Sequence, residues 1–114
     1  MKIYIAGPMR GIKEFNFPAF FKAAQQLRAD GHEVFSPAER DIALHGDQIW
    51  KDRSGDLTEI SHIGFSLREA IADDLNWICR NGDAVALLPG WEKSSGATLE
   101  KATADFLKLQ VIYL

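Results

Sequence analysis

The first eleven residues place a short apolar segment directly before a glycine-containing turn. Lys2–Ala6 has the composition of a buried strand, and Gly7-Pro8-Met9-Arg10-Gly11 follows without a polar stretch between them. In an open parallel sheet, ligands bind at the carboxyl ends of the strands, where small residues let backbone N–H groups approach an anion. The junction therefore predicts a ligand-binding corner, with Arg10 as a cation beside it.

The glycine spacing of this turn does not identify the ligand. It matches neither the G-x-G-x-x-G fingerprint of dinucleotide-binding folds nor the G-x-x-x-x-G-K-[ST] phosphate loop. Taken alone, the turn is equally consistent with a plain connection between a strand and a helix.

Strand and helix patterns alternate along most of the chain. Asn16 is the expected N-cap of the first helix, Ser66 opens an S-x-x-E capping box, and Asn81-Gly82 is the expected left-handed terminator of the helix that follows Ser66. The alternation predicts one α/β domain over residues 1–114, a small doubly wound, Rossmann-like or flavodoxin-like parallel sheet of four or five strands. We expect strands at 2–6, 33–36, 83–88 and 111–114, and helices at 16–30, 66–80 and 97–107.

Residues 38–65 show no sustained period of either kind. They predict a long ordered loop or lid, with a short helix near Gln48–Trp50 as the alternative.

Composition narrows the classes of ligand. The 114 residues carry 13 basic and 16 acidic side chains, a formal net charge of −3, so the chain lacks the basic field that attracts a nucleic-acid polymer. A small phosphorylated ligand stays compatible with this charge.

The sequence gives little indication of a metal site or a disulfide bond. Cys79 is the single cysteine, and the spacing of His32, His45 and His62 suits no shared metal ligation. No signal-peptide pattern and no apolar run of about 18 residues is present. We therefore expect a cytoplasmic protein that needs no metal or cofactor and does not contact a membrane.

Two adjacent aspartates fall on different sides of the helix after Ser66. With Ile71 as the centre of the apolar stripe, Asp74 lies about 60° away and Asp73 points to the opposite side. A carboxylate on a core-facing edge is costly unless it is paired or used. Asp74 is therefore either a proton donor at a pocket or a structural acid that binds a neighbouring loop.

The start of the last helix supplies further candidates. Glu100 lies at the edge of the buried stripe, where the helix dipole favours its ionised form, although acids are also common there without a function. Ser94, Ser95 and Gly96 can cap the helix or bind an anion. Trp91 can stack on a ring or pack in the core.

Four segments together resemble the nucleoside 2-deoxyribosyltransferase superfamily. They are Tyr4–Gly11, Asp74–Ile78, the strand from Asp83 and Ser95–Glu100. The same segments are similar to the superfamily's hydrolytic branch, the 2′-deoxynucleoside 5′-monophosphate N-glycosidases, and to small phage and bacterial proteins grouped with them.

The resemblance implies roles for individual residues. Glu100 corresponds to the glutamate that attacks the anomeric carbon, Asp74 to the aspartate that assists the leaving base, and Tyr4 to the tyrosine of the first strand. Arg10 and the serines resemble the monophosphate-binding elements, which favours a nucleotide over a nucleoside. The substrate-binding residues expected on this basis are Gly7, Pro8, Arg10, Gly11, Trp91, Ser94, Ser95 and Gly96.

The expected activity is cleavage or transfer at the N-glycosidic bond of a 2′-deoxynucleotide or deoxynucleoside, and the resemblance also implies a homo-oligomer, a dimer or larger. The alternative is a non-catalytic nucleotide-binding or signalling module, in which Glu100 binds a ribose hydroxyl. The sequence leaves open the base, and whether water or a second base is the acceptor.

Overall fold

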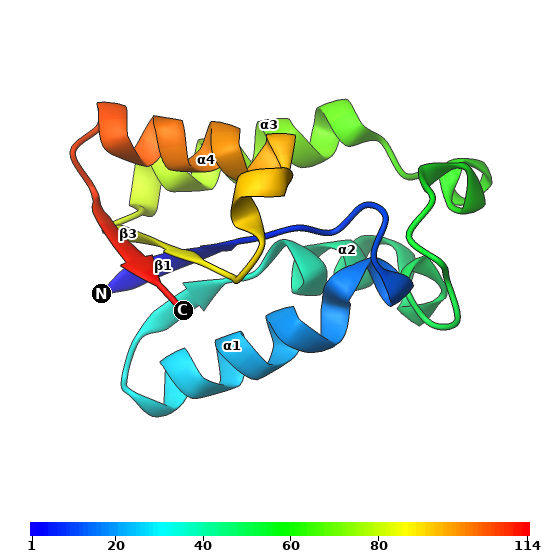
Figure 1. Ribbon diagram of the computed structural model, residues 1–114, viewed down its shortest axis with the longest axis horizontal. Coiled ribbons are helices and arrows are strands. Elements are labelled where there is room, and N and C mark those ends of the chain that lie inside the picture. Colours follow the sequence, from blue (N-terminus) through cyan, green and yellow to red (C-terminus); the bar gives the residue numbers. More distant parts are fainter.

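Four parallel strands form one sheet in the computed structural model, which describes residues 1–114. The order across the sheet is β2-β1-β3-β4, and helices cover both faces (Figure 1). This confirms the predicted doubly wound, Rossmann-like α/β fold, with four strands. The strands are β1 (Lys2–Ala6), β2 (Glu33–Phe35), β3 (Ala84–Leu87) and β4 (Gln110–Tyr113).

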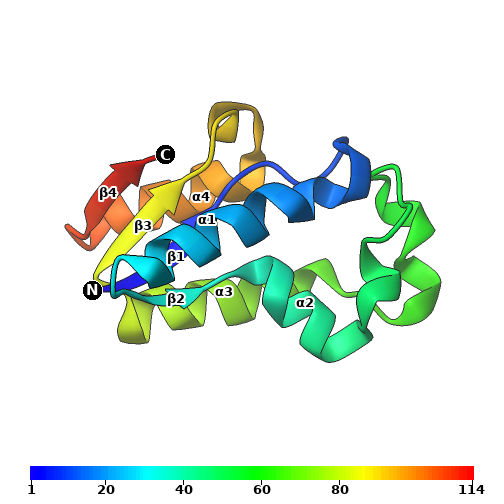
Figure 2. The same ribbon diagram turned by 90° about the horizontal axis from the view of Figure 1, so that it is seen from below.

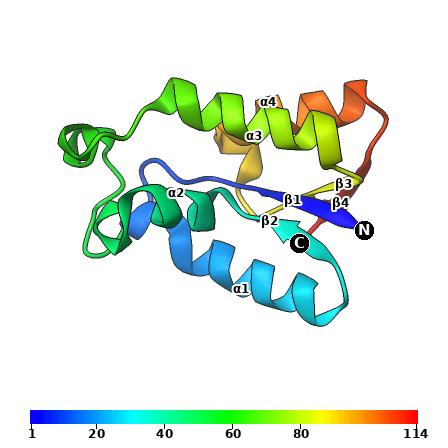
Figure 3. The same cartoon turned by 180° about the vertical axis from the view of Figure 1, so that it is seen from behind.

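The helices lie in two layers. Helix α1 (Phe17–Ala29) lies on one face of the sheet, and α3 (Leu67–Asn81) and α4 (Ser95–Phe106) lie side by side on the other (Figures 1 and 3). Helix α2 (Pro37–His45) continues from the end of β2 and contacts α1 (Figure 2). No helix is both long and apolar enough to span a membrane.

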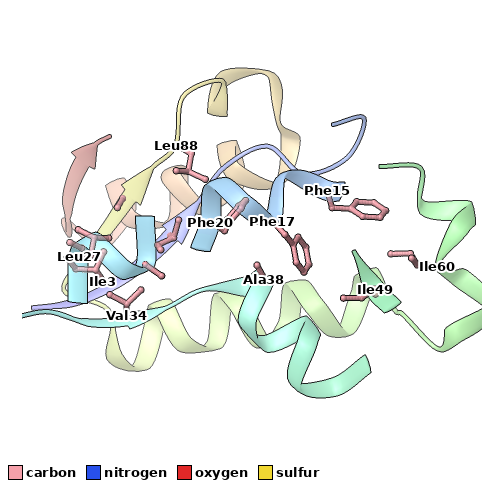
Figure 4. Packing of buried hydrophobic residues seen from close by; sticks show 14 residues of the cluster. Ile3, Phe15, Phe17, Phe20, Leu27, Val34, Ala38, Ile49, Ile60 and Leu88 are labelled. Carbon is pink, nitrogen blue, oxygen red and sulfur yellow. The ribbon is translucent and has the colours of Figure 1, made fainter. Parts of the chain in front are cut away.

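Alternation along β1 divides the core between the two faces. Ile3 and Ile5 belong to the larger cluster with α1, whose side chains extend from the sheet to residues 49 and 60 (Figure 4). Tyr4 and Ala6 belong to the smaller cluster with α3 and α4. The two-residue period of a strand thus directs the Tyr4 side chain toward α3 and α4.

The strand order reverses between β1 and β3. The chain passes from β1 to β2 on one side and then crosses to β3 on the other, with Ala6 paired to Leu87. The turn after β1 and the loop after β3 therefore meet at one edge of the sheet. Gly7 is required at this junction, because a Cβ there would lie 2.7 Å from the Cβ of Leu88.

Helix α2 was missed in the segment predicted as a loop. Its buried side carries Asp41, and Arg40 beside it is only slightly exposed. Because charged residues take these inward positions, the sequence lacks the apolar periodicity that predicts a helix. The rest of the segment consists of short 3-10 turns: η2 (Asp47–Ile49), η3 (Leu57–Glu59) and η4 (Ser61–Ile63). Turn η2 overlaps the alternative helix considered near residue 48.

This segment is fixed against the turn after β1. Gly11 N donates to Gly55 O at 2.9 Å, and Glu14 N donates to Arg53 O at 2.7 Å. Gly55 lies so close to the turn that a Cβ would be 2.3 Å from the Ile12 carbonyl oxygen. The segment is therefore packed closely against the turn after β1.

Asn16 is the N-cap residue of α1, as predicted, but its side chain does not cap the helix, and the prediction for Gly82 was wrong. Asn16 has a left-handed φ of 63°, and its side chain donates to the Pro8 carbonyl in place of capping α1. Gly82 has a φ of −66°, so it is no left-handed terminator. A glycine is needed there because a Cβ would approach Ile78 O to 2.9 Å.

Candidate functional site

A cavity of about 810 Å³ opens at the carboxyl ends of β1 and β3. It is lined by residues from the turn after β1, from α1 and α2, from the stretch 49–71, from Asp74 of α3, from the loop after β3 and from the start of α4. Ten residues predicted from the sequence meet here: Tyr4, Gly7, Pro8, Arg10, Gly11, Asp74, Ser94, Ser95, Gly96 and Glu100.

Trp91 does not line this cavity. Its ring lies 6.3 Å from that of Tyr113, and the Lys101 ammonium lies 5.7 Å from the Trp91 ring centre. The structure therefore does not bring Trp91 to the site as a stacking residue, because it packs against β4 and α4.

Tyr4 and Glu100 meet at the bottom of the cavity. The fully buried Tyr4 hydroxyl donates to Glu100 Oε2 at 2.5 Å. Glu100 shares the buried stripe of α4 with Ala97 and Ala104, whose small side chains let the helix lie close to the sheet. Strand alternation and helix spacing thus bring together two residues that are 96 positions apart.

Burial controls the ionisation of Glu100. It raises the pKa of the carboxyl from 4.5 to about 8, helped by the nearby Asp74 charge and opposed by the Tyr4 hydrogen bond. The sequence favoured the ionised form, on the basis of the helix dipole. That expectation was wrong because Glu100 lies in the second turn of α4, beyond the free N–H groups of the first turn.

Asp74 is buried and Asp73 is exposed, as the helical positions predicted. The buried stripe of α3 is Ala70, Asp74 and Ile78, so its centre lies closer to Asp74 than the predicted Ile71. Burial raises the pKa of Asp74 to about 6, against the charge of Arg40. One oxygen, Oδ1, has no hydrogen-bond partner although it is buried at the cavity.

Arg40 is a component that the sequence did not reveal. Its Nε donates to Asp41 Oδ1 at 2.8 Å, and its Nη1 donates to Ala70 O and Asp73 Oδ2, both at 3.2 Å. Asp74 Oδ1 lies 3.3 Å from the same Nη1, a charge contact without hydrogen-bond geometry. Arg40 therefore joins α2 to α3 and fixes a positive charge beside Asp74.

The buried charges at this end of the cavity do not balance when every acid is ionised. The carboxyl groups of Asp41, Asp74 and Glu100 are all buried, and Arg40 is the cation among them. Burying an uncompensated charge is strongly unfavourable, so the cluster retains a proton. Such a cluster can supply a carboxylate and a carboxylic acid at the same pH.

The mouth of the cavity carries positive charge. The exposed Arg10 donates from Nη2 to Ser95 Oγ at 3.4 Å, and Lys93 lines the same region. Ser94 Oγ accepts from Ala97 N at 3.1 Å, so Ser94 is the helix cap, while the Ser95 hydroxyl lies beside Arg10. This end of the cavity suits an anion.

The stretch from η3 to the start of α3 contributes only apolar residues to the cavity lining. We call these residues the apolar wall: Leu57, Ile60, Phe65, Leu67, Ala70 and Ile71. No group of three or more His, Cys, Asp or Glu side chains has the arrangement of a metal site.

Comparison with curated proteins and with solved structures finds no match to this chain. A family match covers residues 1–113, almost the whole chain. The chain therefore belongs to the family described as Domain of unknown function (DUF4406).

Proposed function

We propose that this protein cleaves, or exchanges the base at, the N-glycosidic bond of a 2′-deoxynucleotide through a covalent ester on Glu100. The observation that carries the proposal is the buried cluster of Tyr4, Glu100 and Asp74 at the strand-order reversal, in a cavity with a cationic mouth. The resemblance of four sequence segments to the nucleoside 2-deoxyribosyltransferase superfamily supports the same activity.

In the first step, a carboxylate oxygen of Glu100 bonds to C1′ of the sugar. The bond from C1′ to the base nitrogen breaks, and its electron pair stays on the base, which takes the proton of the Asp74 carboxylic acid. The transition state has oxocarbenium character, as in retaining glycosidases. The Tyr4 hydroxyl holds Glu100 Oε2, which leaves the other oxygen for attack.

In the second step, water adds to C1′ and the ester bond to Glu100 breaks. The Asp74 carboxylate accepts the proton that water loses, so both acids return to their starting states. A second base in place of water gives transfer of the sugar.

The two acids must share one proton for this sequence. Burial raises the pKa of Asp74 to about 6 and that of Glu100 to about 8, so the pair holds one proton between these values. With these values the shared proton lies mainly on Glu100, so the reactive arrangement, in which Asp74 holds the proton and Glu100 is ionised, is the less populated one and is reached when the proton moves from Glu100 to Asp74. The fixed charge of Arg40, 3.3 Å from Asp74 Oδ1, favours the Asp74 carboxylate, which is the form that accepts the proton of water in the second step, so Arg40 is a positioning residue for Asp74.

The anion-binding end favours a nucleotide over a nucleoside. Arg10, Ser95 and Lys93 lie at the mouth, where a 5′-phosphate can be bound while the sugar lies over Glu100. This arrangement places the charged end of the ligand close to solvent and the reacting bond in the buried region.

The test is to incubate the protein with each 2′-deoxynucleoside 5′-monophosphate and to measure release of free base. A second incubation with an added base distinguishes transfer from hydrolysis. Absence of release from every nucleotide, with binding intact by calorimetry, would overturn the enzymatic proposal in favour of a nucleotide-binding module.

A further inference from the structure

We propose that the apolar wall selects the base, so that the preferred substrates are 2′-deoxynucleotides whose base carries an apolar substituent, such as 5-alkyl pyrimidines. This inference rests on the proposed function and names the substrate class of that site. Its evidence is the position of the wall, the chemistry of the cavity lining and the way the wall is held.

The wall begins next to the proposed acid. Ala70 and Ile71 lie one turn before Asp74 on α3, and Leu67 lies two turns before it, about 11 Å along the helix axis. A base must lie beside Asp74 to receive its proton. The part of the base that extends toward the start of α3 therefore contacts the wall.

Some of the wall is open to a ligand. Leu67 is 44% exposed although it is a large apolar residue that lines the cavity, and Phe65 and Ile71 are partly exposed. Ile60, also part of the wall, is buried. Covering Leu67 with an apolar group would remove carbon surface from water, which is favourable by about 25 cal/mol per Å².

The cavity lining offers few groups that could recognise the hydrogen-bonding edge of a base. It contains no Asn, Gln, His or Thr, and its polar side chains lie at the acid cluster or at the cationic mouth. An apolar pocket distinguishes two substrates that differ by one methylene group by roughly 10- to 200-fold. A pocket built to hydrogen-bond the substrate discriminates far more strongly between polar groups. We therefore expect the cavity to distinguish bases by the size of their apolar substituent.

Both ends of the wall belong to ordered elements. Backbone hydrogen bonds from Gly11 to Gly55 and from Glu14 to Arg53 attach the stretch that precedes Leu57, η3 (Leu57–Glu59) carries its own capping box at Asp56, and Leu67, Ala70 and Ile71 belong to α3. A preformed wall selects by shape, because little ordering free energy is spent on binding.

The experiment measures kcat/KM for base release from 2′-deoxyuridine 5′-monophosphate, its 5-methyl and 5-ethyl forms, and 2′-deoxycytidine 5′-monophosphate. We expect at least about a tenfold gain from the 5-methyl group, and less than about threefold between uracil and cytosine. Leu67→Gln and Ile71→Gln should each reduce the methyl preference to about twofold. Leu107→Gln, at a leucine 39% exposed outside the cavity, is the matched control and should leave the preference unchanged.

Failure of this inference can be separated from failure of the proposed function. Base release at equal rates from the alkylated and unalkylated nucleotides, in wild type and variants alike, overturns the role of the wall and leaves the activity standing. If no nucleotide releases its base, calorimetry on the same series decides: tighter binding of the 5-methyl form that Leu67→Gln abolishes supports the wall, and equal Kd values overturn it.

Discussion

The hydroxyl of Tyr4 in the first strand donates a 2.5 Å hydrogen bond to Oε2 of Glu100 in the last helix. This bond favours the ionised form of Glu100 and so acts against the effect of burial on its pKa. Tyr4 thereby controls both the orientation and the protonation of the proposed nucleophile.

The rate of base release should follow a bell-shaped pH profile with its maximum between about 6 and about 8. Below about 6 Asp74 and Glu100 are both protonated, and above about 8 both are ionised, so the form with one proton dominates between them. The measurement is kcat/KM from pH 4.5 to 9.5. A rate that increases up to pH 9.5 would contradict the shared proton.

Tyr4→Phe should slow base release by roughly 10- to 100-fold, because it removes the donor that holds Glu100. Loss of that bond also raises the pKa of Glu100, so the alkaline limb of the pH profile should move to higher pH. Tyr113→Phe, at an exposed tyrosine of β4, is the control and should change neither quantity.

Glu100→Gln should abolish base release and alter the pH dependence of stability. The pKa of Glu100 is raised in the folded protein, so its stabilising contribution is complete below about 4.5 and is lost as pH rises through about 8. The wild-type free energy of unfolding should therefore fall between pH 5 and pH 9, by an amount on the order of a few kcal/mol.

The Glu100→Gln protein should show a smaller fall, measured by urea unfolding at both pH values. Asp105→Asn, at an exposed acid of the same helix, should behave as wild type in both assays. An unchanged pH dependence in Glu100→Gln would show that burial of Glu100 does not govern this part of the stability.

Arg40→Gln should destabilise the fold by roughly 3 kcal/mol, because it leaves buried Asp41 and Asp74 without their cation. The Arg40 charge lowers the pKa of Asp74, so its removal should also move the acid limb of the rate profile to higher pH. Adding Asp41→Asn should recover part of the stability and, because the Asp41 charge raises the pKa of Asp74, should move that acid limb part of the way back. A profile identical to wild type would contradict the positioning role of Arg40.

Arg10→Ala should raise KM for a 2′-deoxynucleoside 5′-monophosphate by about 10- to 100-fold, with little effect on the corresponding nucleoside. Arg10 is exposed, so its replacement should leave the Tm close to that of wild type. Lys22→Ala, at an exposed lysine of α1, is the control. Equal effects on nucleotide and nucleoside would exclude a phosphate contact at Arg10.

Much of the fold could be predicted because its main elements have clean periods. The strand alternation at Lys2–Ala6 and the apolar run ending at Leu88 indicated a parallel sheet, and the helical position of Asp74 indicated its burial. The family resemblance assigned Tyr4 and Glu100 to one site, but their hydrogen bond was not predicted, because periodicity within each element does not specify how distant elements meet.

The rest of the fold and of the site depends on contacts between distant elements, which no local sequence pattern indicates. Helix α2 was hidden because Arg40 and Asp41 take positions that apolar residues would normally fill, and their pairing appears only when α2 meets α3. The pKa of Glu100 was misjudged for a related reason: the helix dipole can be inferred from the sequence, but the depth of burial is set by the packing of α4 on the sheet.

The separation of Tyr4 and Glu100 by 96 positions has a consequence for folding. Strand β1 lies between β2 and β3, so the sheet cannot be completed until the beginning of the chain and its last third have associated, an arrangement of high contact order. A chain that has been synthesised only as far as α3 contains Asp74 and Arg40 but lacks Glu100, the proposed nucleophile. The proposed activity would then appear only with this late long-range step of folding, and incomplete chains would lack it.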